Sequence, residues 1–471
     1  MFIESFKETH MFYMNHLSCP IVVSALFCSN SVIGQVINED MRLNVPEQVQ
    51  RDIFGASVAI SGDTVVVGAI LDDDLGDASG SAYLFDLNTG EMTFKLLPSL
   101  GHFEMEFGNS IDIDGDVVAV GAAFTNLDIG GVNGYRRGAV FLFDRLSGEE
   151  IWVLTDEERQ GQNGAYGVGS DISMSDGVIG VGALWDNDQG NDSGSGFVFD
   201  VDSGLSIQKV FPVDETESCQ FGETVAVSDG LIAIGATRDS VHGEWSGSVH
   251  VYDAMSGLLI QKISPEDGES RDFFGCSVAL EDGLLVVGAF GDDDSAYHSG
   301  AVYIFDAYSG EQLDKIYASD ADEYDVFGSA VAISDGIIAV GADDNSDFGV
   351  RSGSAYLFLA STGKQIAKLL PSDGAPEDQF GRSLDIFQGR VVVSAIYDDS
   401  YGINSGSAYV FTVPQICEAD LNGDGSLNYL DVSEFMEALM DGDRAADFTN
   451  DGRYNFFDVS DFITSYIAGC P

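Results

Sequence analysis

Oxygen-bearing side chains near the C-terminus recur at the spacing of a calcium-binding loop. From Asp420 the sequence reads D-L-N-G-D-G-S-L-N-Y-L-D, with a glycine at loop position 6, where such a loop turns sharply. Carboxylate, amide and carbonyl oxygens are the ligands that the hard cation Ca²⁺ prefers. The loop therefore predicts a calcium site whose ligands are Asp420, Asn422, Asp424, Ser426 through its backbone carbonyl, Asn428 and Asp431.

A second copy of this loop begins at Asp447. Thr449 stands at its position 3 and weakens the predicted site, because a hydroxyl replaces an amide or carboxylate oxygen. The alternative interpretation is an acidic tail that binds no metal. The ligands predicted for the second site are Asp447, Thr449, Asp451, Arg453, Asn455 and Asp458.

A helix is expected after each loop, because apolar residues follow at positions i, i+3, i+4 and i+7. These residues are Val432, Phe435, Met436 and Leu439 in the first unit and Val459, Phe462, Ile463 and Tyr466 in the second. Each bound ion would neutralise carboxylates that otherwise repel one another, so metal binding and folding of this small segment would be coupled.

Two such loop–helix units, with Asp at position 12 and no full entering helix, resemble a type I dockerin domain over residues 416–471. The resemblance implies attachment to a cohesin-like or cell-surface protein. In that family, loop positions 10 and 11 help to select the partner. Here these positions hold Tyr429-Leu430 and Phe456-Phe457, which are more apolar than the small hydroxyl pairs of cellulosomal dockerins. Either the partner differs, or these side chains pack internally.

The body of the chain consists of seven repeats. Each reads Phe-Gly, a short alternating run, a tight turn, an apolar run ending in Gly-Ala, an acidic loop and then a second alternating run. The separations between the leading aromatic residues are 53, 59, 55, 53, 53 and 53. These leading residues are Phe54, Phe107, Tyr166, Phe221, Phe274, Phe327 and Phe380.

Each repeat has the pattern of four strands, with turn residues where hairpins need positive φ. Four-stranded units that cannot cover their own faces pack radially, so residues 35–412 are expected to form a seven-bladed β-propeller, and a linear solenoid is the alternative. The seventh repeat lacks a fourth strand. Met41–Val45 resembles the fourth-strand segments and is expected to complete that blade. The predicted fold class is an all-β propeller followed by a small α-helical dockerin/EF-hand-like domain.

The repeats resemble FG-GAP repeats, the blades of the integrin alpha-chain propeller, over about residues 41–412. The resemblance rests on Phe-Gly followed in phase by Gly-Ala, from which the seventh copy departs with Ser394-Ala395. Integrin-type blades often carry an Asp-x-Asp-x-Asp-Gly calcium loop in the first hairpin. Here that hairpin is cut to turns such as Ser61-Gly62-Asp63, so calcium in those hairpins is not expected.

Acidic residues gather in a different loop, three positions after the Ala of each Gly-Ala. In a propeller, this loop shares a face with the segment that leads into each Phe-Gly. One interpretation is a cation-dependent surface that binds glycans or proteins, and the other is that each Asp caps the backbone of its own loop. Trp185 and Trp245 lie in two of these loops and either stack on sugar rings or pack within the loop. The seven residues are Asp72, Thr125, Asp186, Asp239, Asp292, Asn345 and Asp398.

Composition excludes several classes of partner. The chain has 471 residues, with 78 Asp and Glu against 20 Lys and Arg, and a formal net charge of −58. Such a surface repels phosphate backbones and anionic head groups, so nucleic-acid and peripheral-membrane roles are not expected. The hydrophobic content of 45% is sufficient for a packed core.

Residues 1–34 are expected to be a signal peptide. An apolar run from Leu17 to Phe27 precedes small and polar residues, with cleavage expected near Gly34–Gln35. The alternatives are a buried strand or a membrane anchor. No later segment has the ~20 apolar residues of a spanning helix. The expected location is therefore secreted, extracellular or on the cell surface.

Four cysteines remain after this leader. Cys417 and Cys470 bracket the last segment, which suits a disulfide in an oxidising compartment. For Cys219 and Cys276, both a disulfide and two inert thiols are consistent with the sequence.

Motifs that signal catalysis are few. The sequence has no G-x-S-x-G, H-E-x-x-H, phosphate-binding Gly-Lys loop or Cys-x-x-Cys. Three hypotheses follow. The favoured one is a secreted, non-catalytic binding or adhesion propeller tethered through its calcium-dependent C-terminal module. The others are a polysaccharide-degrading enzyme carried by the same module, and a structural surface or matrix protein.

Overall fold

The structure is a computed structural model that describes residues 35–45, 50–125, 128–129, 132–133, 137–156, 166–214, 218–414, 419–421, 427–441, 446, 448 and 453–469. The expected leader and the two cysteines Cys417 and Cys470 lie outside these ranges. None of the helices in these ranges is both long enough and apolar enough to cross a bilayer.

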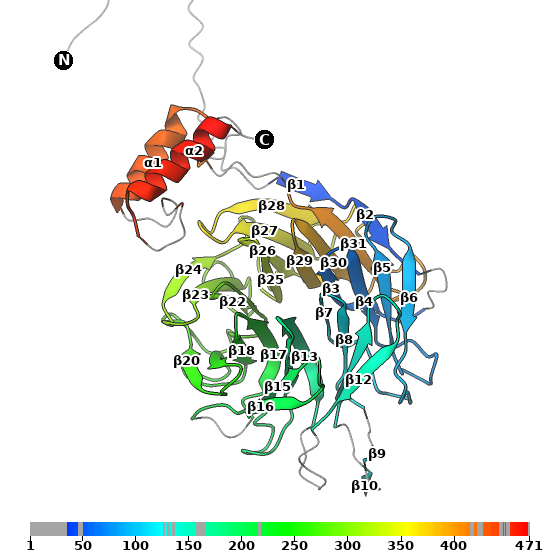
Figure 1. The fold of residues 1–471 in the computed structure, drawn as a ribbon. Coiled ribbons are helices and arrows are strands. Elements are labelled where there is room, and N and C mark those ends of the chain that lie inside the picture. The colour runs from blue at the N-terminus through cyan, green and yellow to red at the C-terminus, as the bar shows by residue number, and fades with distance from the viewer. Residues whose placement is uncertain are drawn as a thin grey trace, which may run out of the picture. The chain divides into compact units, whose positions relative to one another are not determined.

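Seven antiparallel sheets form a ring of blades (Figure 1), and the strands are numbered along the chain. Blade 1 contains β3 (Phe54–Ser61), β4 (Thr64–Ala69), β5 (Ser81–Asp86) and β6 (Met92–Leu96). Blade 2 contains β7 (Ile111–Asp114), β8 (Val117–Ala122), β11 (Ala139–Asp144) and β12 (Glu150–Leu154). Blade 3 contains β13 (Val168–Ser175), β14 (Val178–Ala183), β15 (Ser195–Asp200) and β16 (Ser206–Val210). A two-stranded hairpin, β9 (Asp128–Ile129) and β10 (Val132–Asn133), is inserted in blade 2.

The remaining blades follow the same order. Blade 4 contains β17 (Phe221–Ser228), β18 (Leu231–Ala236), β19 (Ser248–Asp253) and β20 (Leu259–Ile263). Blade 5 contains β21 (Val278–Glu281), β22 (Leu284–Ala289), β23 (Ala301–Asp306) and β24 (Gln312–Ile316). Blade 6 contains β25 (Ala330–Ser334), β26 (Ile337–Ala342), β27 (Ser354–Leu359) and β28 (Gln365–Leu370). Blade 7 contains β29 (Phe380–Phe387), β30 (Arg390–Ala395) and β31 (Ser407–Thr412).

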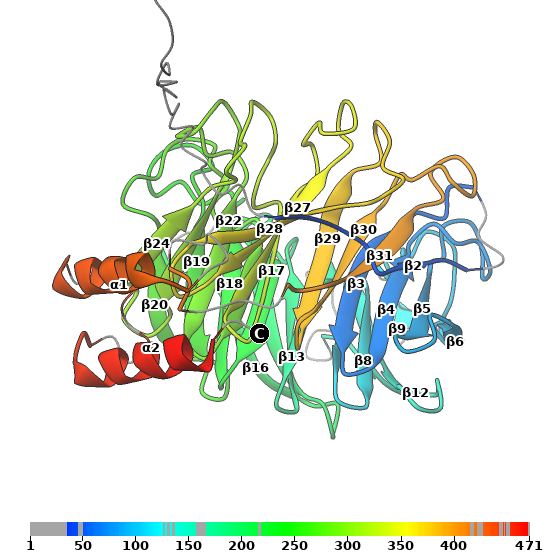
Figure 2. The same ribbon diagram turned by 90° about the horizontal axis from the view of Figure 1, so that it is seen from above.

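The first strand of each blade lies innermost. These strands contact one another around the ring in the order β3, β7, β13, β17, β21, β25, β29 and back to β3. In Figure 2, β17 lies beside β13 and β29 lies beside β3, in agreement with these contacts. The second and third strands are almost wholly buried, because each blade is covered by its two neighbours. The predicted seven-bladed propeller is therefore confirmed.

The repeated glycines of Phe-Gly and Gly-Ala meet between blades. Gly288 of blade 5 faces Gly328 of blade 6, and a Cβ added to Gly288 would lie 2.0 Å from the Gly328 carbonyl oxygen. Gly328 itself has a φ of +90°, in the region that favours glycine. The two motifs recur in phase because one blade's Gly-Ala packs directly on the next blade's Phe-Gly.

In blade 3 the predicted leading residue was wrong. Val168, not Tyr166, makes the bridge to the preceding blade that Phe107 and Phe221 make elsewhere. Counted from Val168, the separations to Phe107 and Phe221 become 61 and 53. Five of the eight extra residues lie within blade 2, in the loop between β8 and β11 that contains the β9–β10 hairpin, and the other three lie between β11 and Val168. The period is otherwise constant.

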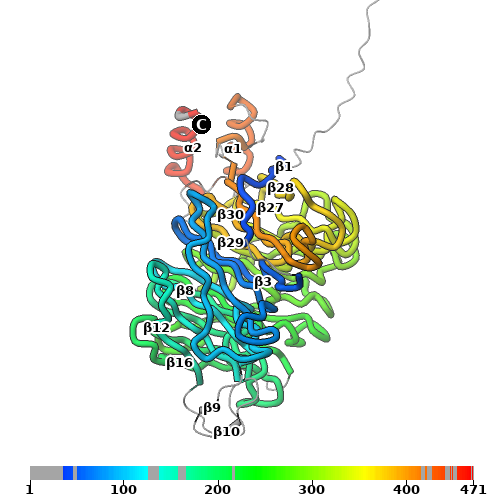
Figure 3. Tube along the Cα trace, turned by 90° about the vertical axis from the view of Figure 1, so that its right-hand side faces the viewer, coloured from blue at the N-terminus to red at the C-terminus, as the bar shows by residue number. Residues whose placement is uncertain are grey.

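An N-terminal strand closes the ring, as expected. β2 (Met41–Leu43) pairs antiparallel with β31 and becomes the fourth strand of blade 7. A further strand that the sequence did not indicate, β1 (Gln35–Asn38), pairs parallel with β28 at the outer edge of blade 6 (Figure 3). Both segments cover strand edges that would otherwise be unpaired.

Closure by β2 leads to a test with truncated chains. A chain beginning at residue 46 loses both strands and should unfold in one transition, with a melting temperature lower by roughly 5–15 °C, because an edge and a buried charge in blade 7 lose their partners. Circular dichroism melts of this chain and of the chain beginning at residue 35 would measure the shift.

A chain beginning at residue 39 is the matched control, since it lacks β1 but keeps β2. It should melt close to the full ring. Equal melting temperatures for the chains that begin at residues 35 and 46 would contradict closure by β2.

Three aspartates on innermost strands connect neighbouring blades. Asp171 accepts a hydrogen bond from the backbone N–H of Val225 at 2.7 Å, and Asp385 accepts one from Ile60 at 2.8 Å. Burial raises the pKa of Asp171 and Asp385 to about 7, and that of Asp112 to about 6. These contacts therefore link neighbouring blades, but burial makes the ionised form of each carboxylate less favourable.

This makes the stability of the ring dependent on pH. Because the folded pKa of Asp171 lies above its unfolded value near 3.9, its contribution to stability is complete below about pH 4 and is lost as the pH rises to about 7. Asp171→Asn keeps an acceptor for Val225 and should raise the free energy of unfolding by about 1–3 kcal/mol at pH 8, with little effect at pH 4.

Denaturant unfolding across this pH range would measure the difference. Asp176→Asn is the control, because Asp176 is exposed in the turn after β13. If the curves of Asp171→Asn and the unsubstituted chain run parallel over this range, Asp171 does not carry the pH dependence.

Cys219 and Cys276 are both thiols rather than a disulfide. The Sγ of Cys219 donates to the Ser193 carbonyl, and that of Cys276 donates to the Gly328 carbonyl. Burial raises the pKa of Cys276 to about 12, which makes it a poor nucleophile.

The C-terminal segment contains two helices of equal length. α1 (Tyr429–Asp441) and α2 (Phe456–Ala468) begin at position 10 of the first and the second predicted loop, respectively. Phe435 and Phe462 stack with ring centroids 4.1 Å apart, and Phe448 meets both edge-on. The helices predicted from apolar spacing are confirmed.

Candidate functional site

One face of the ring is built from two kinds of loop. The loop between the second and third strands of a blade is hydrogen-bonded to the segment that leads into the next blade. Tyr324 N–H donates to the Tyr297 carbonyl at 2.9 Å, and Glu377 N–H donates to that of Val350 at 2.8 Å. The expectation that these loops share a face is confirmed, and they are called the loop face below.

The aspartates three positions after each Gly-Ala are buried at the base of these loops. One oxygen accepts a backbone N–H two residues further on, at 3.1 Å from Asp74 to Asp72 and at 3.0 Å from Asp188 to Asp186. Each Asp therefore caps the backbone of its own loop, which is one of the two interpretations given by the sequence. The second oxygen is directed into the blade, where in blade 1 it accepts bonds from the hydroxyls of Ser81 and Tyr83. All seven members of the set are buried, namely Asp72, Thr125, Asp186, Asp239, Asp292, Asn345 and Asp398.

A cation from the outermost strand of the blade reaches this second oxygen. The whole chain has only seven lysines, and five of them occupy this one position. In blade 7 the closing strand β2 supplies Arg42 instead, which bonds the first oxygen of Asp398, the one that also accepts the backbone N–H of Ser400. The nitrogen–oxygen distances are 2.8 Å for Lys95–Asp72, 2.7 Å for Lys209–Asp186, 3.0 Å for Lys262–Asp239, 2.8 Å for Lys315–Asp292 and 2.8 Å for Arg42–Asp398.

Strand register places these cations. Lys95 is paired across the sheet with Tyr83, so both side chains lie on the same side of the blade, with the ammonium 5.1 Å from the ring centroid. Burial opposes ionisation of Asp72, but hydrogen bonds from Lys95 and Tyr83 outweigh it and hold its pKa below the usual value. Burial also opposes the charge of Lys95, and its bonds to Asp72 and Asp74 raise its pKa.

Blades 2 and 6 lack the Asp–Lys pair. In blade 2 the aspartate is replaced by Thr125, the tyrosine by Phe141 and the lysine by Val153, which pairs with Phe141 across the sheet. The two charges and the phenol hydroxyl are therefore lost together. In blade 6 the aspartate is replaced by Asn345, and Lys368 instead bonds the carboxylates of Asp320 and Asp347.

Blade 4 contains a histidine at the tyrosine position. His250 is fully buried and pairs across the sheet with Lys262. Burial and the neighbouring Lys262 lower the pKa of His250 to about 4, so the ring is neutral at physiological pH. Asp239 therefore depends on Lys262 for its neutralising charge.

The chain itself supplies the positive charge that the alternative interpretation assigned to a bound metal ion in these loops. Of the two interpretations, the contacts support aspartates that cap their own loops. Excess negative charge remains, because Lys315 lies among three carboxylates, those of Asp267, Asp292 and Asp294. The loop face is therefore acidic even where its buried charges are paired.

The pair in blade 4 gives the clearest test of this arrangement. Lys262→Met should lower the free energy of unfolding by about 3–5 kcal/mol, because Asp239 is left buried without a counter-charge. Adding Asp239→Asn to Lys262→Met should recover most of the loss, since an amide carries no charge. Denaturant melts of the single and double variants would measure the coupling.

Arg390→Met is the control for removal of a surface charge. The Arg390 side chain is 47% exposed and lies 3.8 Å from Asp40, so its loss should change stability by less than about 0.5 kcal/mol. A cost for Lys262→Met as small as that of Arg390→Met would exclude a structural role for the pair.

Large apolar side chains are exposed on the same loops. In blade 5 and its junction with blade 6, the rings of Tyr297 and Tyr324 meet at 5.3 Å. Such side chains among acidic residues are typical of binding surfaces, and they recur on the loops of several blades. The exposed members include Leu75, Phe103, Tyr297, Tyr324, Phe348, Val350, Tyr401 and Ile403.

The predicted calcium ligands lie partly outside the described residues. Among the described ones, Asp431 and Asp458 are fully buried at corresponding places at the starts of α1 and α2. Asp431 accepts the backbone N–H of Asn428 at 2.7 Å, and Asp458 accepts that of Asn455 at 2.7 Å. Asp420 and Arg453 are also described. The other predicted ligands, Asn422, Asp424, Ser426, Asp447, Thr449 and Asp451, lie outside those residues.

The two buried carboxylates fit an ion-binding loop in one respect. Each of these carboxylates closes a segment rich in other oxygen donors, as the last ligand of an ion-binding loop does. The described residues themselves contain no group of three or more His, Cys, Asp or Glu side chains placed to hold a metal. The two calcium sites stay predictions.

The apolar pairs at loop positions 10 and 11 do not pack internally. Tyr429 is 76% and Leu430 42% exposed, and Phe456 is 77% and Phe457 67% exposed. They occupy equivalent places in the first turns of α1 and α2. Internal packing, one of the two interpretations left open by the sequence, is therefore wrong, and a different partner stays a prediction.

The fold and its glycine contacts define a propeller of Phe-Gly/Gly-Ala blades. The family model described as FG-GAP repeat matches residues 38–85, 92–143, 206–252, 259–305, 311–358 and 364–411, more than half of the chain, and the chain belongs to this family. Each match runs from the fourth strand of one blade to the third strand of the next. Residues 144–205, which include Val168, are not matched. No curated protein matches the chain.

Proposed function

We propose that the chain is a secreted binding or adhesion protein with two working parts. The loop face of the propeller receives a protein or glycan ligand, and residues 416–471, folded around two calcium ions, attach the protein to a cohesin-type or cell-surface partner. The observation that carries the first part is the set of exposed apolar side chains on acidic loops whose backbone is fixed by buried ion pairs.

Two features of the C-terminal segment support the second part. Asp431 and Asp458 are buried at corresponding positions, where each would complete a ring of oxygen ligands. The exposed pairs Tyr429-Leu430 and Phe456-Phe457 present apolar area to solvent, as a contact surface does. When bound, calcium would supply positive charge to these clustered carboxylates, and the chain's own helices would present the contact surface.

Calcium binding is tested on the full chain by calorimetry. Two ions should bind, and Asp431→Asn and Asp458→Asn should each remove or weaken one site by about tenfold or more, because an amide lacks the ligand charge but can still accept the backbone N–H. Removal of calcium with a chelator should expose residues 416–471 to proteolysis while the propeller stays intact.

Asp461→Asn is the matched control, because Asp461 is exposed on α2 outside both loops. It should leave both sites unchanged. In the same variants, capture by an immobilised cohesin module should require calcium and both loop aspartates. Absence of calcium heat, or equal binding by all three variants, would refute the proposed tether.

A further inference from the structure

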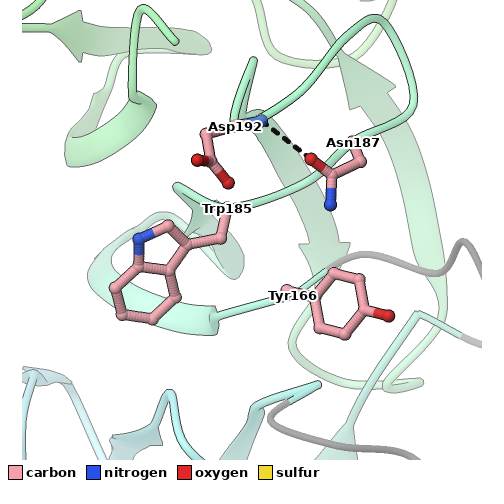
Figure 4. Close-up of a pocket in the computed structure, with 4 residues that line it drawn as sticks. All are labelled: Tyr166, Trp185, Asn187 and Asp192. Carbon is pink, nitrogen blue, oxygen red and sulfur yellow. Dashed lines mark hydrogen bonds between the residues drawn. The ribbon is translucent and has the colours of Figure 1, made fainter.

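A hollow lies on the loop face of blade 3. Tyr166, Trp185, Asn187 and Asp192 line a cavity of about 380 Å³ (Figure 4). Three of them belong to the loop between β14 and β15, and Tyr166 lies just before β13. The size is within the range of pockets that bind small molecules.

The indole of Trp185 is held as a platform. The backbone of Gly167 lies close against it, since an added Cβ there would be 2.6 Å from Cε3 of the indole. Phe124 packs on it with ring centroids 5.2 Å apart and planes tilted by 49°. The indole is therefore supported from the protein side, yet it is still partly exposed and lines the cavity.

Polar groups of defined orientation accompany this platform. The Oδ1 of Asn187 accepts the backbone N–H of Asp192 at 2.7 Å, which fixes the amide and leaves its Nδ2 group as the donor side. In Figure 4 this nitrogen points towards Tyr166, while the carboxylate of Asp192 lies on the side of Trp185. The hollow thus combines aromatic area, N–H donors and a carboxylate acceptor.

We propose that this hollow binds a sugar ring of a neutral glycan. The C–H face of a pyranose packs on an aromatic face, and its hydroxyls both accept from an amide and donate to a carboxylate. This inference rests on the proposed binding role of the loop face and names the class of ligand at one place on it.

The negative charge and the amide donor at the hollow distinguish a neutral glycan from anionic and cationic ligands. An anionic ligand would meet the carboxylate of Asp192, and the buried carboxylates of Asp186 and Asp188, which share the single Lys209, add to the negative field. A quaternary ammonium suits aromatic rings and a carboxylate, but it offers no acceptor to the Asn187 amide. A neutral polyhydroxyl ligand can use all of the lining groups.

Calorimetry on the full chain with cellohexaose, laminarihexaose and mannohexaose tests the proposal. At least one should bind. Trp185→Ala should weaken binding by about tenfold or more through loss of the stacking surface, and Asn187→Ala should weaken it by a smaller factor. Unchanged melting temperatures would show that the variants remain folded.

Trp245→Ala is the matched control. Trp245 lies in the corresponding loop of blade 4, where Arg238 and Arg271 lie 5.6 and 5.5 Å from its ring, so its loss should leave sugar affinity unchanged. No binding of any of the three hexasaccharides, equal affinity in Trp185→Ala, or binding of choline in their place would overturn the proposal. Calcium titration of the C-terminal loops is independent of all these outcomes, so the two proposals can fail separately.

Discussion

In five of the seven blades, a carboxylate buried beneath the loop between the second and third strands, and the cation that reaches it from the outer edge of the blade, fix the geometry of the propeller's loop face. Taking an Asp such as Asp292 out of water is costly unless a counter-charge and hydrogen bonds replace the solvent. Lys315 and Tyr303 supply both. The loop can therefore adopt its native form only when the fourth strand is in register with the third. Such pairs contribute more to specifying one arrangement than to overall stability.

The same requirement explains how the ring is closed. Asp398 of blade 7 has a cation beside it, and no strand follows β31 among the described residues to provide one. Arg42 on β2 reaches this position from the other end of the sequence and also bonds Ser407 at 2.6 Å. Pairing of β2 with β31 thus completes a hydrogen-bonded sheet and a charge pair at once, while β1 covers the neighbouring edge of blade 6.

Much of the fold could be predicted from the sequence because the repeat period is long and nearly constant. The predicted start of a repeat was wrong only in blade 3. There Val168 occupies the position of the leading aromatic residue, and the predicted residue, Tyr166, lies two residues earlier. The Asp–Lys pairs were missed, although lysines such as Lys262 and Lys315 recur at the same place in successive repeats. Their partners lie more than twenty residues away in the chain, and strand register rather than spacing brings them together.

At the C-terminus, apolar spacing predicted the two helices, because one face of each must be buried against the other. That spacing could not show whether Tyr429 and Phe456 face inward or outward, since each precedes the helical pattern. The hollow at Trp185 was also beyond the sequence, because it depends on Gly167 and Phe124 approaching the indole from other segments.

Each family match begins on the last strand of one blade and ends on the third strand of the next. The sequence unit and the sheet are thus out of step by one strand, and every unit covalently joins two neighbouring sheets. Insertion or deletion of one whole unit would therefore change the number of blades without creating an unpaired edge, because β2 would always complete the last sheet. This architecture can grow or shrink by tandem duplication while its closure stays the same.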